Sequence, residues 1–351
     1  MGAGARADLV ASAPPTSRIL GTGHYAPSRA LDNVELEKLV DTSDDWIATR
    51  TGIRRRHVAA DGEVTSDMAA AAGRRALEAA GLSAADLDLI IVGTVTPDTP
   101  IPGCAVQVQR KLGAMDIPAF DIAAACAGFV YGLQIGQQFV TTGAARCVLI
   151  IGVELLSRAL DWKDRTTCVL FGDGAGAVVL GPSDLDVAGD DGARATGRAG
   201  LLSCGIYTDG SLARALRIPA GGSAVPLDAE RIRARDHKVQ MVGNHVFKTA
   251  VKNLTSSSAQ ILKASGLTSA QLDWVVAHQA NIRIIHQVAG RLGFPLEKFV
   301  INIEEFGNTS SASIPIALDE AVRDGRIEKG HHVLMCALGA GISWGAALVR
   351  M

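Results

Sequence analysis

The sequence lacks the features that mark membrane, metal-binding and nucleic-acid-binding proteins. No apolar run reaches the roughly 18 residues that a membrane-spanning helix needs. A formal net charge of -2 and a pI near 6.4 leave no basic footprint for nucleic acid or an anionic membrane. The cysteines contain no C-x-x-C pair and no Cys/His cluster at zinc spacing, so no metal site is predicted.

Signals for targeting and for disulfides are also missing. Residues 1–17 are rich in Ala, Gly and Pro but contain no continuous apolar segment of the signal-peptide kind, so we expect a disordered N-terminal tail. The cysteines stand mostly in apolar runs, which is typical of reduced thiols in a reducing compartment. We therefore expect a cytoplasmic protein with neither nucleic acid nor membrane as a partner.

Small residues are abundant: there are 38 glycines and many alanines, whereas aromatic residues make up only 4% of the chain. This composition favours closely packed α/β layers, and 351 residues exceed one typical core. Continuous β-branched runs predict strands buried on both faces at residues 87–96 and 147–154. Helices are predicted at 66–80 and 104–112, and a set of connecting hairpins across 182–217.

The second half of the chain repeats the first at an offset of 185 residues. Residues 81–92 match residues 266–277 at five of twelve positions, with three more pairs similar. A repeat of this length predicts two similar α/β halves related by a pseudo-two-fold axis. We place the N-terminal half at residues 18–185 and the C-terminal half at residues 186–351.

The first half contains a suggestive stretch at residues 120–129, where a short apolar strand ends at Cys126 and runs into an apolar helix. A side chain at such a turn lies over free backbone N–H groups and the positive end of the helix dipole, which favours a thiolate. These ten residues alone fit a small buried structural cysteine at least as well.

The repeat supplies partners for this cysteine. The offset of 185 aligns Cys126 with Ser311 and Gly93 with His278. The second half therefore also has a strand-to-helix turn, which begins near Asn308. Equivalent turns of two pseudo-symmetric halves approach each other at the interface, where pockets form. Cys126, His278 and Asn308 are thus predicted to meet.

A Cys-His-Asn set fits two mechanisms. In a hydrolase the His deprotonates the Cys, and water later releases the acyl group. In a carbon–carbon bond-forming synthase the Cys carries an acyl thioester. Neutral His and Asn then donate hydrogen bonds to the carbonyl of a second thioester, which stabilise the enolate formed as carbon dioxide leaves. The three residues alone do not choose between these mechanisms.

Four motifs add a family resemblance: Ala-Cys-Ala-Gly-Phe at 125–129, His-Gln-Ala-Asn-Ile-Arg at 278–283, Gly-Asn-Thr-Ser at 307–310 and Gly-Ala-Gly-Ile-Ser-Trp-Gly at 339–345. In order and spacing, from about residue 18 to the end, the chain resembles β-ketoacyl-acyl carrier protein synthase III of the thiolase superfamily. The resemblance implies an α/β, five-layered αβαβα thiolase fold and a homodimer. It also implies decarboxylative Claisen condensation of an acyl-CoA primer with malonyl-acyl carrier protein, which initiates type II fatty acid or polyketide synthesis without a bound cofactor.

Carried over residue by residue, the resemblance implies that Cys126 is the acylated nucleophile and that His278 and Asn308 form the decarboxylation site. Trp46 and Arg165 match positions on either side of the CoA adenine, as a cation–π platform would require. The pantetheine tunnel and its mouth are matched by Thr42, Arg50, Asn244 and Phe247. The basic face that meets the acidic carrier protein is matched by Lys248 and Arg283.

Departures from the commonest family pattern lie around the acyl pocket. Where the family usually has Phe-Gly-Gly-Gly, the corresponding residues here are Leu338-Gly339-Ala340-Gly341. The oxyanion hole would then combine the N–H groups of Cys126 and Ala340. Ile101 matches a residue that crosses the dimer to form the floor of the acyl pocket, where Phe is common. The smaller side chain indicates a primer longer than acetyl.

Two further activities and one non-enzymatic role remain as alternatives. An acyltransferase of secondary metabolism would pass the Cys126 acyl group to an alcohol, an amine or another carbon nucleophile, but it would need no second amide donor such as Asn308. A thioester hydrolase requires a water-accessible Cys, and a CoA-binding scaffold would have no use for Cys126. The length and branching of the primer, and the choice between fatty acid and polyketide pathways, are not encoded in these motifs.

Overall fold

The computed structural model of the chain describes residues 17–183 and 199–351. The disordered tail predicted at 1–17 lies outside the described residues except for Ser17, which begins strand β1 (Ser17–Tyr25). The boundary predicted between residues 185 and 186 also lies outside the described residues. The division into halves at that position therefore stays a prediction.

Within the described part, five strands of the N-terminal sequence form one mixed sheet in the order β1-β7-β6-β4-β5. Strand β4 is parallel to β5 and β6, whereas β7 is antiparallel to β1 and β6. The elements up to residue 182 are β1, β2 (Arg29–Asp32), α1 (Asn33–Leu36), α2 (Asp44–Thr51), β3 (Arg55–Val58), α3 (Thr65–Ala79), β4 (Leu89–Gly93), α4 (Cys104–Leu112), β5 (Ala119–Ile122), α5 (Gly128–Thr141), β6 (Val148–Glu154) and β7 (Gly174–Pro182).

The C-terminal sequence forms a second sheet, whose described strands have the order β11-β12-β13-β8. Strand β11 is parallel to β12, and β13 is antiparallel to both β12 and β8. The elements after residue 199 are β8 (Gly200–Thr208), β9 (Leu216–Arg217), α6 (Ala229–Arg233), β10 (Gln240–Met241), α7 (Gly243–Ala264), β11 (Trp274–Ala277), α8 (Ile282–Leu292), α9 (Ile303–Phe306), α10 (Ser313–Arg323), β12 (His332–Gly339) and β13 (Ser343–Arg350).

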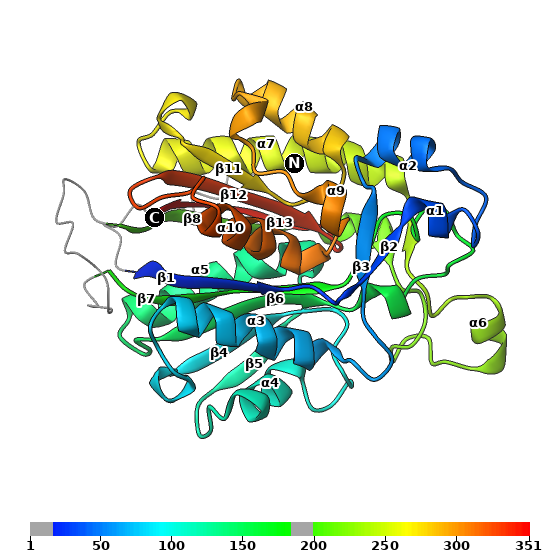
Figure 1. Cartoon of the computed structure of the whole chain (residues 1–351), viewed down its shortest axis with the longest axis horizontal. Helices are drawn as coiled ribbons and strands as arrows, with labels where there is room; N and C mark the ends of the chain where they lie inside the picture. The colour runs from blue at the N-terminus through cyan, green and yellow to red at the C-terminus, as the bar shows by residue number, and fades with distance from the viewer. Residues whose placement is uncertain (1–16, 184–198) are drawn as a thin grey trace, which may run out of the picture.

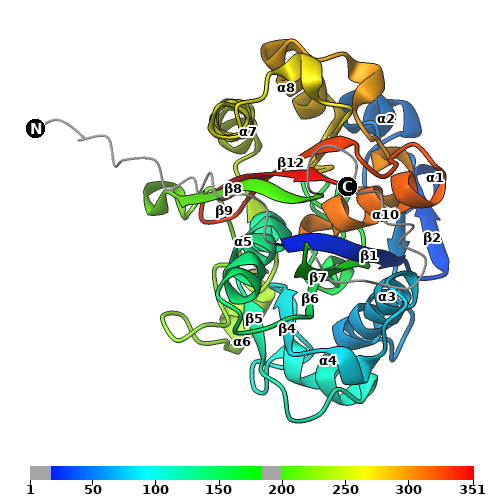
Figure 2. The same ribbon diagram turned by 90° about the vertical axis from the view of Figure 1, so that its left-hand side faces the viewer.

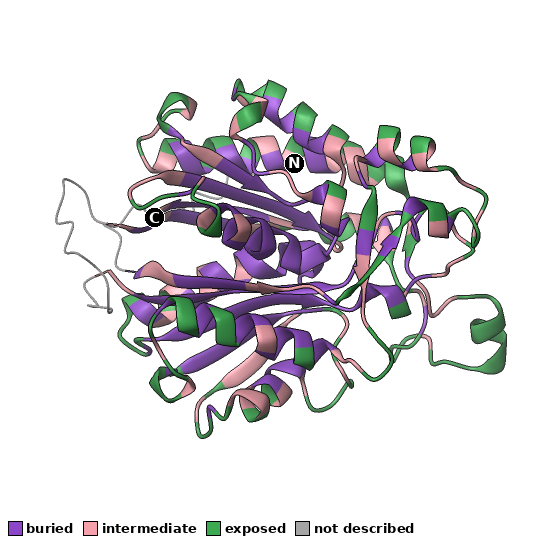
Figure 3. Ribbon diagram, viewed as in Figure 1, coloured by how far each residue is buried: buried purple, intermediate pink, exposed green. Residues whose placement is uncertain are grey.

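The two sheets and their helices stack in five layers (Figures 1 and 2). Helices α3 and α4 cover the outer face of the N-terminal sheet, and α7 and α8 cover the outer face of the C-terminal sheet. Helices α5 and α10 lie between the sheets and contact both. The sheets and the two central helices are mostly buried, whereas the outer helices have both buried and exposed residues and the projecting α6 is exposed (Figure 3). The predicted αβαβα architecture is confirmed.

The backbone repeats itself at the offset seen in the sequence. Leu89 of β4 is paired with Val148 of β6, and 185 residues later Trp274 of β11 is paired with Val333 of β12. The 3₁₀ turn Ala125–Ala127, which carries Cys126, has its equivalent in the 3₁₀ turn Ser310–Ala312. The first residue of each turn has a positive φ, 45° for Ala125 and 53° for Ser310. The predicted pseudo-symmetry is confirmed.

Two local predictions were wrong. Residues 182–217 are not all connecting hairpins, because β8 is a nine-residue strand that pairs with β13 at the edge of the C-terminal sheet. Its glycines and small polar residues resemble a loop, but they suit a strand that packs against helices α5 and α7, and a Cβ added at Gly205 would meet Tyr207 Oη at 2.8 Å. The strand predicted to reach residue 96 ends at Gly93, because Thr94 and Thr96 turn away to hydrogen-bond to Glu154.

A buried carboxylate joins the last central helix to the N-terminal sheet. Asp319 of α10 accepts hydrogen bonds from Thr22 Oγ1 at 2.6 Å and from Arg323 Nε at 2.7 Å, and its Oδ2 lies 2.6 Å from His24 Nδ1. Burial alone would raise the pKa of Asp319, but the hydrogen bonds from His24, Arg323 and Thr22 hold it below its usual value. Helix α10 leads directly out of the turn at Asn308, so this contact helps to position the site.

We predict that Asp319→Asn lowers the free energy of unfolding by about 3 kcal/mol, because it leaves buried donors without an ionised partner. Asp324→Asn is the matched control just after helix α10, where Asp324 is exposed and its partner Arg326 is only half-buried. Solvent screening limits the cost there to about 0.5 kcal/mol. Urea unfolding at one protein concentration measures both values. Equal losses in the two variants would show that Asp319 has no special part in stability.

The same pair of variants has an expected pH dependence. Because the folded-state pKa of Asp319 is depressed, its stabilisation is present above the unfolded pKa of about 3.9 and is lost as the pH falls through the folded value. The difference between the wild type and Asp319→Asn should therefore shrink below about pH 4. A difference that grows on acidification would contradict this assignment.

Candidate active site

Cys126 lies in the 3₁₀ turn between β5 and α5, at the start of a central helix. Its backbone N–H packs against Gly339 at the end of β12, where an added Cβ would come within 2.6 Å of the Cys126 nitrogen. The thiol is buried, and burial raises its pKa to about 12, against the lowering effect of the neighbouring Ser310. The predicted effect of the helix start is therefore outweighed by burial, and the resting side chain is a thiol.

His278 directly follows β11 and is buried beside the N-terminus of α10. Its Nδ1 lies 2.6 Å from Ser313 Oγ, which also accepts a hydrogen bond from Gln279 N at 3.4 Å. Because Ser313 Oγ accepts from the backbone, its own proton is available for Nδ1, and the ring proton then resides on Nε2. Burial lowers the pKa of His278 to about 3, so the imidazole is neutral at physiological pH.

Asn308 is held by backbone contacts on both sides. Its N–H donates to Leu170 O at 2.8 Å, and its carbonyl accepts from Gly172 N at 3.0 Å. The side-chain Oδ1 accepts from Ser310 N at 2.9 Å. This bond fixes the amide orientation and leaves Nδ2 as the donor. Both donors next to Cys126, from His278 and Asn308, are therefore uncharged.

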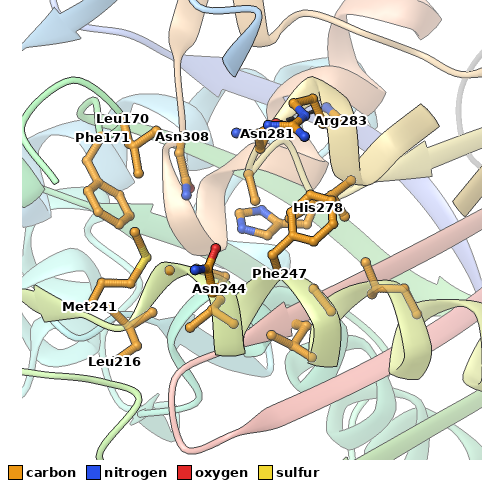
Figure 4. Close-up of a pocket in the computed structure, with 18 residues that line it drawn as sticks. Leu170, Phe171, Leu216, Met241, Asn244, Phe247, His278, Asn281, Arg283 and Asn308 are labelled. Atoms are coloured by element: carbon orange, nitrogen blue, oxygen red, sulfur yellow. Dashed lines mark hydrogen bonds between the residues drawn. The ribbon is translucent and has the colours of Figure 1, made fainter. Parts of the chain in front are cut away.

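These three side chains line one cavity of about 280 Å³ (Figure 4). The sequence placed them in two different halves, and the structure brings them to the same space. The cavity is also lined by four other residues that the sequence singled out: Asn244, Phe247, Arg283 and Leu338. A second hollow of about 430 Å³ adjoins it, since it shares Phe247 and Arg283. The way out of the cavity thus passes between α7 and α8.

The residues predicted for the CoA adenine, Trp46 of α2 and Arg165, form a separate cluster together with Arg50, which was predicted for the tunnel mouth. Ser43 caps the N-terminus of this helix, and its hydroxyl accepts a hydrogen bond from Trp46 N. Gly52, with a φ of 82°, caps the C-terminus. The guanidinium of Arg165 and that of Arg50 each lie 4.9 Å from the centre of the Trp46 ring. Arg165 also donates to Asp41 O at 2.9 Å. The structure thus brings Trp46, Arg50 and Arg165 together, next to the cavity rather than in its wall.

The remaining predicted residues do not line the cavity. Thr42 has a buried hydroxyl with no hydrogen-bond partner, and Lys248 is exposed on α7. Ile101 is 88% exposed, so it does not contribute to the pocket of its own chain. Ala340 follows Gly339, and its backbone is therefore close to the Cys126 turn. The roles predicted for these four residues stay predictions.

Sequence reasoning missed three polar residues that contact the predicted set. Ser313 orients His278, Ser310 contacts both Asn308 and Cys126, and Glu154 is a buried carboxylate beside them. A charged residue at the end of the buried run 147–154 was a signal for Glu154. Ser313 had no such signal, because the offset of 185 aligns it with a glycine, Gly128.

No group of three or more His, Cys, Asp and Glu side chains that could hold a metal ion is found among residues 17–183 and 199–351. In the same part of the chain, the helices are too short or too polar to cross a bilayer. All six cysteines are free thiols and are buried.

Comparisons with known proteins agree over nearly the whole chain. The family model of 3-oxoacyl-[acyl-carrier-protein] synthase III matches residues 120–195, and the model of its C-terminal part matches residues 262–351. The β-ketoacyl-[acyl-carrier-protein] synthase III of Thiobacillus denitrificans is 50% identical over 338 residues, covering 95% of this chain and 99% of the relative. That of Caldanaerobacter subterraneus is 48% identical over 332 residues, covering 95% and 97%.

Solved structures give the same result. The 3-oxoacyl-[acyl-carrier-protein] synthase III of Aquifex aeolicus has a TM-score of 0.84 at 43% identity, covering 95% of this chain and 100% of that one. The priming β-ketosynthase of the R1128 polyketide pathway has a TM-score of 0.85 at 37% identity, covering 96% and 98%. The chain therefore has the thiolase fold and belongs to the 3-oxoacyl-[acyl-carrier-protein] synthase III family.

Proposed function

We propose that this enzyme transfers the acyl group of an acyl-CoA primer to Cys126 and then condenses it with malonyl-acyl carrier protein. The product is a 3-ketoacyl-acyl carrier protein, which initiates a fatty acid or a polyketide. The observation that carries this proposal is that Cys126, His278 and Asn308, from two halves of the chain, line one buried cavity. No resident cofactor is needed, because both substrates arrive as activated thioesters.

The state of His278 favours condensation over hydrolysis. A hydrolase of the Cys-His-Asn kind needs a His that accepts the thiol proton and becomes a cation. Burial opposes that charge at His278, whose pKa is lowered to about 3. A neutral Nε2–H and the Asn308 amide instead suit a carbonyl oxygen on which negative charge develops during decarboxylation. Both donors stabilise the enolate without being titrated between pH 5 and 9.

The tunnel residues support a CoA thioester as primer. Phe247 and Asn244 of α7 line the cavity that leads to Cys126, and an extended pantetheine arm fits such a passage. Outside it, Trp46 lies next to Arg50 and Arg165. An adenine ring inserted between Trp46 and Arg165 would replace their direct contact with stacking on both faces. Thr42 would lie along the same route, and the N–H groups of Cys126 and Ala340 would bind the thioester oxygen.

Basic residues around the mouth support an acidic carrier protein as the second partner. Arg283 lies at the mouth, 5.8 Å from the centre of the Phe247 ring. Lys248, which follows Phe247 in α7, is exposed. Positive charge around a tunnel entrance raises the rate at which an acidic partner docks. The phosphopantetheine arm of the carrier protein would then enter by the same route that CoA leaves.

We also propose a homodimer that forms at the edge of the N-terminal sheet. In the described part of the chain, β5 pairs only with β4, which leaves its other edge open. Large apolar side chains are exposed around this edge, on α4 and the adjoining loops: Val95, Ile101, Val106 and Met115. A second copy would cover this surface and continue the sheet. Ile101 would then reach the acyl pocket of the partner, beside Leu338. The cytoplasm stays the predicted location.

The first test is covalent. We predict that acyl-CoA leaves a mass adduct on the wild type and that Cys126→Ala abolishes it, because the nucleophile is lost. Cys204→Ala is the matched control: Cys204 is also a buried thiol, but it does not line the cavity, and its variant should be acylated normally. Mass spectrometry after incubation measures the adduct. Acylation of Cys126→Ala would refute the assignment of the nucleophile.

The second test separates the two chemical steps. In His278→Ala and Asn308→Ala we expect acylation to be retained and the condensation rate to fall roughly 10²- to 10³-fold, because each variant removes one donor to the enolate oxygen. His331→Ala, outside the cavity, should match the wild type. Carbon dioxide release from malonyl-carrier protein measures the second step. Loss of acylation in both variants would indicate a hydrolase-type triad instead.

The third test concerns the primer and the dimer together. Ile101→Phe should shift the preference towards shorter acyl-CoA primers by roughly 10-fold per pair of carbons, because a larger ring fills the floor of the partner's pocket. Met115→Phe is the control, since Met115 is also exposed but is predicted to lie only in the interface. Acylation rates over a series of chain lengths measure the shift. An unchanged profile would show that Ile101 does not reach a pocket.

A further inference from the structure

Glu154 is a buried carboxylate next to the nucleophile, and neither step described above uses it. It is the last residue of β6, and its side chain is fully buried. It lies where the nucleophile turn Ala125–Ala127 and the turn Ser310–Ala312 pack against each other. A buried carboxylate that is not part of an ion pair is costly, so a specific use is expected.

The hydrogen bonds of Glu154 divide between its two oxygens. Oε2 accepts from Thr96 Oγ1 at 2.6 Å, from Val95 N at 3.1 Å and from Thr94 Oγ1 at 3.3 Å. These donors anchor the carboxylate to the segment that follows β4. Oε1 accepts only longer hydrogen bonds, from Val95 N at 3.3 Å, from Ser310 Oγ at 3.3 Å and from Ser311 Oγ at 3.4 Å. Oε1 is therefore the oxygen with spare capacity to take a proton.

Ser310 connects this oxygen to the nucleophile. Its hydroxyl donates to Glu154 Oε1 at 3.3 Å, and its turn packs directly against the turn that carries Cys126, where Ser310 lowers the pKa of the thiol. A hydroxyl can accept one proton while it donates another. Cys126, Ser310 and Glu154 thus form a continuous path from the thiol proton to a carboxylate. Ser311 also reaches Glu154, but its hydroxyl is engaged with Gly93 O at 2.8 Å instead of the thiol.

The surroundings leave this carboxylate able to change charge. The titratable groups that face it are the thiols of Cys126 and, from α4, Cys104. Its other partners are neutral hydroxyls and the N–H of Val95. Burial raises the pKa of Glu154 to about 7, while the hydrogen bonds from Thr96, Val95, Ser310 and Thr94 limit the rise. By contrast His278, with its depressed pKa, is a poor acceptor for the same proton.

We propose that Glu154 stores the proton of Cys126, received through Ser310, for as long as Cys126 carries the acyl group. The inference rests on the proposed function, because it assigns the proton transfers of the acylation and condensation steps. In this proposal Ser310 relays the proton and Glu154 accepts it.

The proton balance closes over both steps. During acylation the Cys126 sulfur forms a bond to the acyl carbon, and the bond from that carbon to the CoA sulfur breaks. The thiol proton passes to Ser310, whose own proton moves to Glu154, and the leaving CoA thiolate takes a proton from solvent at the tunnel mouth. During condensation the enolate carbon attacks the acyl carbon and expels the Cys126 thiolate. Glu154 then returns its proton through Ser310, which regenerates the thiol and the carboxylate.

The test is the pH dependence of acylation by acyl-CoA, measured as the rate of adduct formation on the purified full-length protein. In the wild type the acylation rate should rise as the pH passes the pKa of Glu154, because only the carboxylate accepts the proton. We call this rising part of the pH–rate profile the limb. Glu154→Gln keeps the shape but accepts no proton, so its rate at pH 8 should fall roughly 100-fold and the limb should disappear. A side chain that is only structural would change the rate without removing the limb.

Ser310→Ala interrupts the path while keeping the carboxylate. The first-half equivalent of Ser310 is Ala125, which adopts the same positive φ, so alanine fits this backbone. We expect the same loss of rate and limb as in Glu154→Gln. Ser311→Ala is the matched control, one residue along in the same turn: it removes a weak donor to Glu154 but leaves Ser310 in place, so the pH-dependent rise in rate should remain. Thr96→Val removes a donor to the ionised carboxylate, which raises its pKa, so the limb should move to higher pH.

The outcomes separate this inference from the proposed function. If the wild type forms no adduct at all, the proposed function fails. If the adduct forms and both Glu154→Gln and Ser310→Ala keep the wild-type limb and rate, the proton path is wrong and the condensing function stands. A Thr96→Val limb at the wild-type pH would likewise show that the limb belongs to another group.

Discussion

The site depends on how closely the two halves approach each other at their facing turns. A Cβ added at Gly152 would meet Ser311 O at 2.2 Å, and one at Gly176 would meet Ile316 N at 2.7 Å. A Cβ at Gly339 would meet the Cys126 nitrogen at 2.6 Å. Backbone therefore packs directly on backbone across the interface. Strand ends from both halves reach the same point, and their side chains converge on one cavity.

Close packing also sets the electrostatics of that cavity. The same burial raises the pKa of Cys126 and lowers that of His278, so that both groups are neutral when the site is at rest. It also raises the pKa of Glu154 to about 7, which lets this carboxylate take up a proton. In the proposed reaction new negative charge develops on the substrates, first at a departing thiolate and then at an enolate. Uncharged donors from His278 and Asn308 are already oriented for it, with little reorganisation required.

The repeat in the sequence was sufficient to predict two similar halves and the meeting of Cys126 with His278, because an offset of 185 residues determines which strand ends are equivalent. The five layers were implied by the family resemblance. The repeat could not predict contacts that one half makes and the other half lacks. Ser313 orients His278 but aligns with a glycine, and Glu154 accepts hydrogen bonds from hydroxyls that lie up to 157 residues away. The sequence of strand β8 resembled a loop, because small residues are common in turns and are also used where a strand packs closely. Such features depend on tertiary contacts that local patterns do not contain.

The central claim is that one cavity, built from both halves, joins two thioester substrates with loss of carbon dioxide. The most direct measurement is a single turnover of the acylated enzyme with malonyl-carrier protein labelled with ¹³C in its free carboxyl group. The account predicts one labelled carbon dioxide for each 3-ketoacyl product, with no label in that product and a free Cys126 thiol at the end. Label retained in the product, or release of the acyl group as a free acid, would contradict it.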